Sequence, residues 1–466
     1  MRERNDVTTA AGVAPAAGGV LVSIFVPDDH PLLRLKAALD WEAITQVMVR
    51  CWSQAGKNVA GGQGRKWPVS LYVPLVVLMW IKTLHSRHME EYVSESVVAR
   101  RFLDLTEPPM MHVRDHSNID RAERAIDAAG RAEINALIIK TAAEIGFTDG
   151  KILSSDTTVQ EPAIGYPNEP GILKGLAQRI ERNLKKLTRR GVKLAKAGIE
   201  QAKEISRSVK AHHLWAKTKE AKQKVLKQIV KQSEQLIETT KEVIQPVSGR
   251  GGPAKQKAVA GLKRMVEVAG QLIPQIKHWM KTGRVAAGKI IHVGITEARA
   301  IVRGPGRVKF GMKWLINRLS GGYLFGRRVQ AHADETQMPE EAVKEYRELF
   351  GQAATPQMVV YDRGASLPAA AKKLHAEGVE KVGIPPRGQG AWMVGEKDQQ
   401  VVKSQRGKTE GSIGRLKSKK YGFSHRPERS LQSQAAAGQR AIVSANLNTL
   451  LRDLVNQAKA ASLAQG

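Results

Sequence analysis

The sequence is poor in the residues that mark several classes of protein. Cysteine occurs once, as Cys51, which excludes a disulfide framework and a cysteine-rich zinc site and favours a reducing compartment. The most apolar stretch, residues 67–82, contains two prolines and is too short to cross a bilayer. Residues 1–19 lack the long apolar run of a secretory signal. We therefore expect a cytoplasmic protein with no membrane partner.

Acidic residues are also scarce: 44 Asp and Glu stand against 74 Lys and Arg, a formal net charge of +30. Such an excess predicts a polyanionic partner, and nucleic acid is favoured over an anionic membrane because no lipid-binding segment accompanies the charge. The imbalance is strong in residues 172–250, with 20 Lys and Arg against 7 Asp and Glu. With 466 residues, 42% of them apolar, the chain can form two or three domains.

Helical periodicity dominates two long segments. Residues 1–28 are expected to be a disordered tail, and residues 29–148 carry apolar side chains at three- and four-residue spacing, which predicts an all-helical domain. Residues 172–288 return to this period and predict an inserted helical hairpin with a basic outer face. Its expected apolar seam consists of Leu226, Ile229, Val230, Ser233, Leu236, Ile237, Thr240, Val243 and Ile244.

Strand patterns lie on both sides of this insertion. Residues 149–171 and 289–430 together predict an α/β layer architecture, and residues 431–466 predict a closing helix. The expected strands are residues 151–160, 289–295, 307–319, 322–332, 357–362 and 379–386.

Three acids occupy comparable positions in this pattern. Asp156 ends the strand "KILSSD", Asp362 ends the strand "QMVVYD", and Glu410 lies on an expected helix amid strong positive charge. Carboxylates on neighbouring strand ends and a facing helix can converge to hold two magnesium ions, which suits phosphodiester chemistry. We therefore expect a metal-dependent site at these residues.

These residues give the chain a resemblance to bacterial insertion-sequence transposases of the DDE superfamily, which have a ribonuclease H-like core. "SSDTTVQEPAIGYP" is similar to the first-aspartate motif of that family and "VVYDRGAS" to the second. Arg406, Glu410 and Lys417 meet the pattern R-(3)-E-(6)-K, although Lys403 replaces the aromatic residue that many relatives carry before the arginine. Residues 28–42, 64–81 and 100–105 resemble the helical N-terminal region of the family.

The resemblance implies a fold and an activity. The fold would be a ribonuclease H-like mixed-sheet core, interrupted by the basic helical insertion and preceded by an all-α domain for DNA binding or assembly. The enzyme would bind terminal inverted repeats, hydrolyse a phosphodiester bond and transfer the freed 3′-hydroxyl to target DNA. Its partners would be double-stranded DNA, at element ends and target, and further copies of itself, in a nucleoid-associated bacterial setting.

The resemblance also assigns roles to particular residues. Two Mg²⁺ or Mn²⁺ ions would be held by Asp156, Asp362 and Glu410. Arg406 and Lys417 would contact DNA phosphates, and we assign the same role to Arg363 and Arg415.

Several alternatives stay open. Glu396 or Asp398 could replace Glu410 as the third acid, and Asp334 and Glu335 are read as caps of the following helix. At the level of function, the chain could be a catalytically inactive DNA-binding derivative of a transposase. It could also be a ribonuclease H-like nuclease that performs no strand transfer.

Overall fold

The protein was analysed as a computed structural model. It divides into two compact units: a sheet unit, residues 1–160, 313–428 and 432–466, and a helical unit, residues 161–312 and 429–431. Most of the expected tail, residues 1–25, lies outside the described residues. The structure describes residues 26–57, 68–105, 115–302, 308–331, 333–365, 368–386, 388, 390–424 and 430–464.

The sheet unit begins with a helical region, as the periodicity predicts. Three of its helices start at aspartates whose side chains accept hydrogen bonds from backbone N–H groups: Asp40 before α2, Asp115 before α6 and Asp127 before α7. The helices are α1 (Pro31–Ala38), α2 (Trp41–Gln54), α3 (Val69–Lys82), α4 (Ser86–Glu95), α5 (Val97–Phe102), α6 (His116–Arg124) and α7 (Ala128–Glu144).

The apolar stretch predicted to be too short for a bilayer forms α3. Its side chains from Leu71 to Ile81 are buried within the unit, apart from Pro74. In the part of the chain that the structure describes, no single helix is long and apolar enough to cross a membrane. Helices α3 and α4 meet the length and composition criteria only as a pair, and the pair is bent by 103°.

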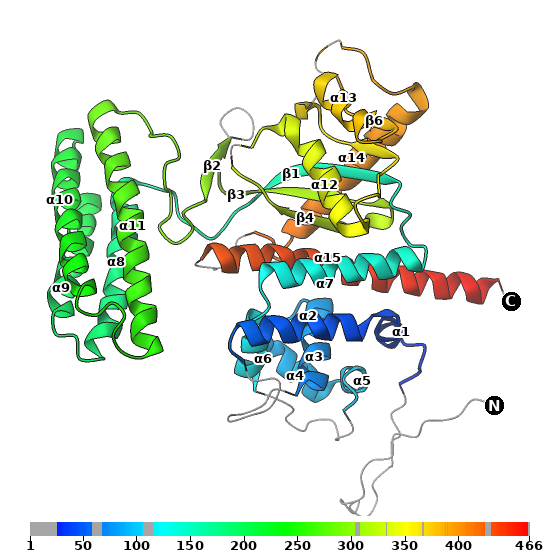
Figure 1. Ribbon diagram of the computed structural model, residues 1–466, viewed down its shortest axis with the longest axis horizontal. Helices are drawn as coiled ribbons and strands as arrows, with labels where there is room; N and C mark the ends of the chain where they lie inside the picture. Colours follow the sequence, from blue (N-terminus) through cyan, green and yellow to red (C-terminus); the bar gives the residue numbers. More distant parts are fainter. Residues whose placement is uncertain are drawn as a thin grey trace, which may run out of the picture. The chain divides into compact units, whose positions relative to one another are not determined.

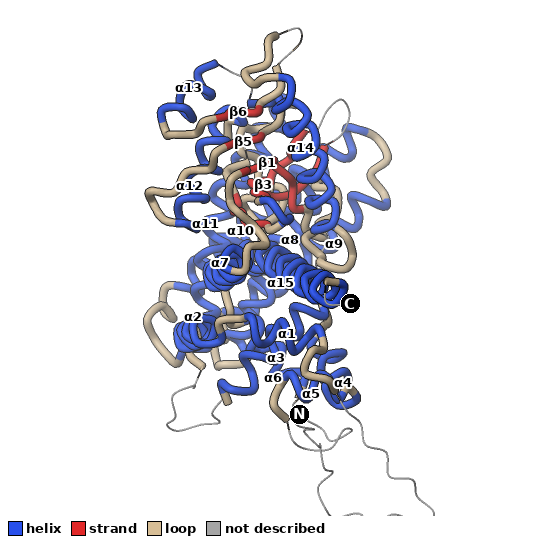
Figure 2. The backbone as a smooth tube through the Cα atoms, turned by 90° about the vertical axis from the view of Figure 1, so that its right-hand side faces the viewer, coloured by secondary structure: helices blue, strands red, loops and turns tan. Residues whose placement is uncertain are grey.

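The described strands form a mixed sheet in the order β2-β3-β1-β5-β6, with β4 also paired to β3. β1 pairs in parallel with β5, and β5 in parallel with β6, whereas β3 and β4 are antiparallel. Figure 2 shows the strands of the sheet side by side. The strands are β1 (Ile152–Gln160), β2 (Arg299–Val302), β3 (Val308–Arg318), β4 (Leu324–Arg328), β5 (Met358–Val360) and β6 (Lys381–Gly383).

Helices cover both faces of this sheet. Because side chains alternate along a strand, Leu153 and Val359 point to one face and join the large core that includes α12, whereas Val360 points to the other and packs against Val402 of α14. Helix α14 lies close to the sheet at Gly383, where an added Cβ would come within 2.4 Å of a Val402 methyl. The covering helices are α12 (Met338–Phe350), α13 (Pro368–Ala376), α14 (Glu396–Lys417) and α15 (Leu431–Leu463), with 3-10 turns Ser320–Gly322, Glu335–Gln337 and Arg363–Ala365.

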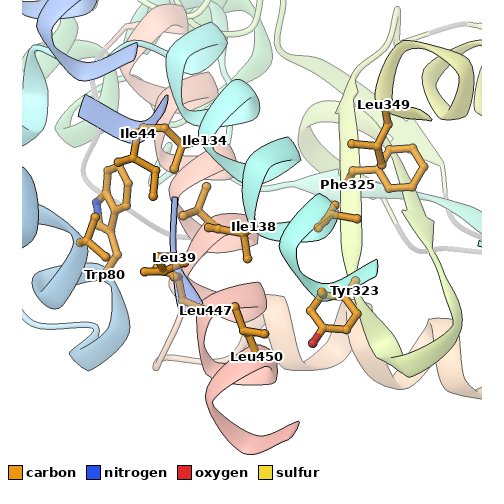
Figure 3. Close-up of a cluster of buried hydrophobic side chains, with 14 of the residues drawn as sticks. Leu39, Ile44, Trp80, Ile134, Ile138, Tyr323, Phe325, Leu349, Leu447 and Leu450 are labelled. Carbon is orange, nitrogen blue, oxygen red and sulfur yellow. The ribbon is translucent and has the colours of Figure 1, made fainter. Parts of the chain in front are cut away.

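One continuous apolar core joins the sheet to the N-terminal helices. Helices α7 and α15 run side by side between the sheet and α1 to α6 (Figure 1). Figure 3 shows how their side chains bridge the two layers, with Ile138 of α7 and Leu447 of α15 between Trp80 and Phe325. The N-terminal helices and the sheet therefore fold as one body.

The helical unit contains four helices in its described part: α8 (Glu169–Thr188), α9 (Ala195–Leu214), α10 (Lys219–Ile244) and α11 (Pro253–Thr282). They lie alongside one another (Figure 1). Every member of the predicted seam on α10 is buried except Ile244, which is partly buried against the same core. The seam prediction is confirmed, although the segment holds more helices than a single hairpin.

One predicted strand is wrong. Residues 289–295 form no strand; instead Ile290 and Val293 pack into the core of the helical unit. The backbone N–H of Ile290 donates to the Gln275 side chain, 2.9 Å away, where a strand partner would otherwise accept it. The other predicted strands are confirmed as β1, β3, β4, β5 and β6, and the mixed α/β class is confirmed with them.

Candidate active site

The two predicted aspartates lie at matching levels of neighbouring parallel strands. In the β1–β5 pair, Ser154 is the partner of Val360. Asp156 and Asp362 each follow these partners by two residues, so they project from the same face of the sheet as Ser154 and Val360. Two residues that are 206 positions apart in the sequence are thus placed at the same level of the sheet.

Each aspartate is held by the chain beside it. One carboxylate oxygen of Asp156 accepts the N–H of Thr157 at 2.7 Å, and one of Asp362 accepts the N–H of Arg363 at 2.8 Å. The side chain of Asp362 is 44% exposed, so its carboxylate remains open to a ligand. Asp156 thus lies within β1, and Asp362 lies two residues after the end of β5, just beyond the paired part of the two strands.

Helix α14 covers this corner with the residues of the R-(3)-E-(6)-K pattern. At about 100° per residue, Arg406, Glu410 and Lys417 fall within about 40° of one another around the helix. The guanidinium of Arg406 lies 2.5 Å from Asp362 and 3.9 Å from Glu410. The pattern therefore places a cation and an acid of one helical face next to the second aspartate.

A second contact seats the same helix on β1. The hydroxyls of Ser154 and Thr409 are 2.7 Å apart and both are buried. Ser154 points to the same face as Asp156, and Thr409 directly precedes Glu410. This hydrogen bond fixes the height of α14 at the level where the acids lie.

The donor set has the chemistry of a divalent-cation site, but the carboxylates are not gathered as ligands. Mg²⁺ prefers carboxylate oxygens and shares its shell with substrate phosphates, which suits two aspartates and an outer glutamate. Among the described residues, no group of three or more His, Cys, Asp or Glu side chains is close enough to hold a metal ion. The guanidinium of Arg406 instead neutralises the carboxylate of Asp362. A metal ion could therefore bind this carboxylate fully only if Arg406 moved away from it.

Arg415 and Arg363, two of the predicted phosphate ligands, are placed differently from Arg406. Arg415 lies on the side of α14 opposite Arg406, at about 180° by helical period, and donates to the Thr449 hydroxyl of α15 at 3.2 Å. Arg363 has an exposed side chain directly after Asp362. The structure therefore places Arg406 beside Asp362 and Glu410 and directs Arg415 toward α15, whereas Lys417 shares the face of Arg406 about two turns beyond Glu410 on α14.

The rival acids lie near the start of α14. Glu396 and Asp398 occupy its first turn, roughly 20 Å along the helix axis from Glu410 at 1.5 Å per residue. Asp398 lies 2.9 Å from Lys381, the first residue of β6, whereas Asp362 follows the last residue of β5. These acids are at the opposite ends of the parallel strands from Asp362.

Sequence reasoning underestimated Glu335. Asp334 caps the 3-10 turn that precedes α12, accepting the N–H of Thr336 at 3.0 Å, and not α12 itself, whose N-cap residue is Gln337. Glu335 instead accepts hydrogen bonds from Tyr361 and Thr157, the chain neighbours of the two aspartates. The order of these residues in the sequence contains no signal for this, because the contact depends on strands far apart in the chain.

Comparison with known proteins adds a separate line of evidence. Residues 21–124 match the family model described as Transposase domain (DUF772), a range that ends with α6 and whose described residues include no strand. No curated protein and no solved structure matches the chain significantly. The match over the N-terminal helices supports a transposase.

Proposed function

We propose that the protein is an insertion-sequence transposase of the DDE type, with Asp156, Asp362 and Glu410 as its catalytic acids. The observation that carries the proposal is the common level of Asp156 and Asp362 on paired parallel strands, with the Arg406–Glu410 face of α14 against them. The transposase-domain match in residues 21–124 supports the transposase part of the proposal from an independent part of the chain.

The chemistry follows from these groups. Asp156 and Asp362 would hold two Mg²⁺ or Mn²⁺ ions and Glu410 would complete the shell; bound there, the ions lower the pKa of the attacking water or hydroxyl and stabilise the leaving oxygen. In the first step water attacks phosphorus and the 3′-oxygen leaves, which frees a 3′-hydroxyl. In the second step the oxygen of that hydroxyl attacks a target phosphorus, the 3′-oxygen of the target strand leaves as the bond to phosphorus breaks, and the proton of the attacking hydroxyl passes through solvent to the leaving oxygen. Arg406 would exchange Asp362 for a DNA phosphate, and Lys417 and Arg363 would contact flanking phosphates.

The topology supports a ribonuclease H-like core. Antiparallel β3 and β4 lie on one side of β1, and parallel β5 and β6 lie on the other. The helical unit then interrupts the chain between β1 and β3. In this arrangement the central strand, β1, carries the first acid, and its parallel neighbour, β5, leads into the second.

The geometry also favours Glu410 over its rivals. Glu410 has a side chain 65% exposed and shares a helical face with Arg406, which contacts Asp362. Asp398 is engaged with Lys381 at the other end of the strands. Glu410 is therefore the acid that we assign to the site.

DNA would be the partner of the basic surface. The excess of Lys and Arg in residues 172–250 lies on helices whose apolar side chains face inward, which leaves the charge outside. Holding two element ends for transfer would require more than one copy of the chain.

The test is cleavage of DNA that carries the inverted repeats flanking the coding region. We expect Mg²⁺- or Mn²⁺-dependent nicking by the full chain and a loss of at least about 10³-fold in Asp156→Ala, with end binding retained in a gel-shift assay. Asp149→Ala is the matched control, because Asp149 precedes the same strand at its other end and bonds Ser320. Equal nicking by Asp156→Ala and wild type would contradict the proposal.

The same assay separates the two alternatives. A supplied target plasmid should acquire the element end if strand transfer occurs, whereas nicked but unjoined DNA would favour a nuclease. End binding with no cleavage at any metal concentration would favour the inactive derivative.

A further inference from the structure

Glu335 forms the centre of a polar network behind the two aspartates. One of its carboxylate oxygens accepts the hydroxyl of Tyr361 at 2.8 Å. The other accepts the hydroxyl of Thr157 at 3.0 Å and lies 2.7 Å from the Lys313 ammonium. Three separate strand segments thus converge on one carboxylate at the start of α12.

Two partners of Glu335 are direct chain neighbours of the two aspartates. Thr157 directly follows Asp156, and Tyr361 directly precedes Asp362. Because neighbouring residues in a strand point to opposite faces, Thr157 and Tyr361 project away from the face that carries the aspartates. Glu335 therefore links the middle of β1, at Thr157, to the segment that follows β5, at Tyr361, on the side opposite the aspartates.

The network holds Glu335 as an anion. Burial by itself would raise the pKa of Glu335, but hydrogen bonds from Lys313 and Tyr361 and the charge of Lys313 outweigh it and hold that pKa below its usual value. Lys313 also donates to the backbone carbonyl of Ala333 at 3.0 Å, which anchors the ammonium. Tyr361 is fully buried, so its hydroxyl depends on this carboxylate for a partner.

We infer that Glu335 is a positioning residue that fixes the level of Asp156 against Asp362 and so sets how tightly the site binds divalent cations. The inference rests on the proposed function, since it concerns the same two aspartates. Glu335 does not touch the ions or the DNA: it acts through Thr157 and Tyr361, whose backbones continue into the two ligands. Groups that hold carboxylate ligands in place are worth about 10- to 100-fold in metal affinity or activity.

The test uses Mn²⁺ titration of the full chain, with free Mn²⁺ followed by its EPR signal, and the Mn²⁺ concentration for half-maximal nicking as a second readout. We expect Glu335→Gln to weaken Mn²⁺ binding by about 10-fold or more and to raise the half-maximal concentration in proportion. Tyr361→Phe, which removes only the hydroxyl contact, should shift both values in the same direction by less. Glu340→Gln is the matched control, because Glu340 lies on α12 and pairs with Lys373 away from the strand ends.

The outcomes distinguish this inference from the proposed function. If wild type binds Mn²⁺ and nicks DNA but Glu335→Gln binds Mn²⁺ equally well, the positioning role is overturned while the catalytic assignment stands. A lowered melting temperature with unchanged Mn²⁺ affinity would likewise reduce Glu335 to a purely structural role. If wild type neither binds Mn²⁺ nor nicks DNA, the proposed function fails and the inference fails with it. If Glu335→Gln does not fold, the same measurements of Mn²⁺ affinity and nicking on Tyr361→Phe test the inference.

Discussion

The two units bury different kinds of side chain. The core of the helical unit is almost entirely aliphatic, and its buried hydroxyls, Ser233 and Thr240, donate to carbonyls four residues earlier in their own helix. In the sheet unit, buried polar groups link distant elements: Gln160 of β1 accepts from Trp314 of β3 and donates to Gln434 of α15. The core of the helical unit therefore relies mainly on apolar burial, with polar contacts such as those of Gln275 and Glu169 at its edge, whereas the sheet unit also buries polar groups that link distant elements.

This difference reflects what each unit has to do. A helical core of interchangeable aliphatic residues tolerates sliding and repacking, which is acceptable where only surface charge is needed. A site that aligns two aspartates needs one unique strand register, and hydrogen-bonded polar networks help to specify it. Removing one member of such a network then costs much stability, because its buried partners lose their hydrogen bonds. The predictions below test this contrast.

The largest expected effect is in the sheet unit, at Arg131. Its side chain is 4% exposed, pairs with the Glu123 carboxylate at 2.8 Å and donates to the Ala436 carbonyl at 2.8 Å. Arg131→Met should cost about 3–5 kcal/mol because it leaves a buried carboxylate without its main partner. Hydrogen exchange should show faster exchange in α7 and unchanged exchange in α10. The double variant Arg131→Met, Glu123→Leu should lose less unfolding free energy than the single variant Arg131→Met. An equal or greater loss would contradict the view that the unpaired Glu123 carboxylate causes the destabilisation.

The next largest effect is expected for a core leucine of the helical unit, which is compared with Arg131 of the sheet unit. Leu262 of α11 is fully buried in the aliphatic core. Leu262→Ala should destabilise this unit by about 3 kcal/mol through reduced burial and a cavity. The check is hydrogen exchange again, with protection lost in α8 to α11 and kept in β1 and β5. Leu262→Met should be nearly neutral, and a severe loss there would show that this core is more specific than we describe.

A smaller, pH-dependent effect is expected at Glu345 of α12. Its buried carboxylate accepts from Asn317 at 3.0 Å, and burial raises its pKa to about 8 although Arg327 opposes the shift. A raised acid pKa contributes stability that is complete below about pH 4.5 and lost as the pH rises toward 8. Glu345→Gln should therefore gain melting temperature relative to wild type on going from pH 5 to pH 8. A constant difference across this range would contradict the assigned protonation.

The smallest effect on stability is expected on the surface of the helical unit. Lys224, Lys227 and Lys231 are exposed on α10. Replacing all three by Gln should change unfolding free energy by only a few tenths of a kcal/mol each. DNA affinity should nevertheless fall, and its log–log dependence on salt should become shallower by up to about 0.9 for each phosphate that these lysines neutralise in the wild type. An unchanged slope would mean that DNA, if bound, uses another surface.

The sequence predicted what periodicity controls. The seam from Leu226 to Val243 and the strand that carries Asp156 follow directly from spacing and alternation. The segment 289–295 has the same β-branched, apolar composition as a strand, but Ile290 and Val293 pack into the core of the helical unit and the Gln275 side chain accepts the backbone N–H of Ile290. Local composition cannot show which of two apolar surfaces such a segment will join.

The candidate site was predictable only in part. The acids could be named from strand ends and from the R-(3)-E-(6)-K spacing, and the helical period put Arg406, Glu410 and Lys417 on one face. The pairing of Arg406 with Asp362 and the role of Glu335 depend on the register of β1 against β5, which is a tertiary property. Arg415 belongs to the same basic run but follows Glu410 by five residues, which turns it toward Thr449.

The most direct measurement is the anomalous scattering of Mn²⁺ in crystals of the full chain with end DNA. We expect manganese between the carboxylates of Asp156 and Asp362, with Arg406 displaced from Asp362 toward a phosphate and Glu410 turned to the ion, and no such peak in Asp362→Asn. Manganese bound elsewhere, with Arg406 still paired to Asp362, would contradict the assignment of these acids.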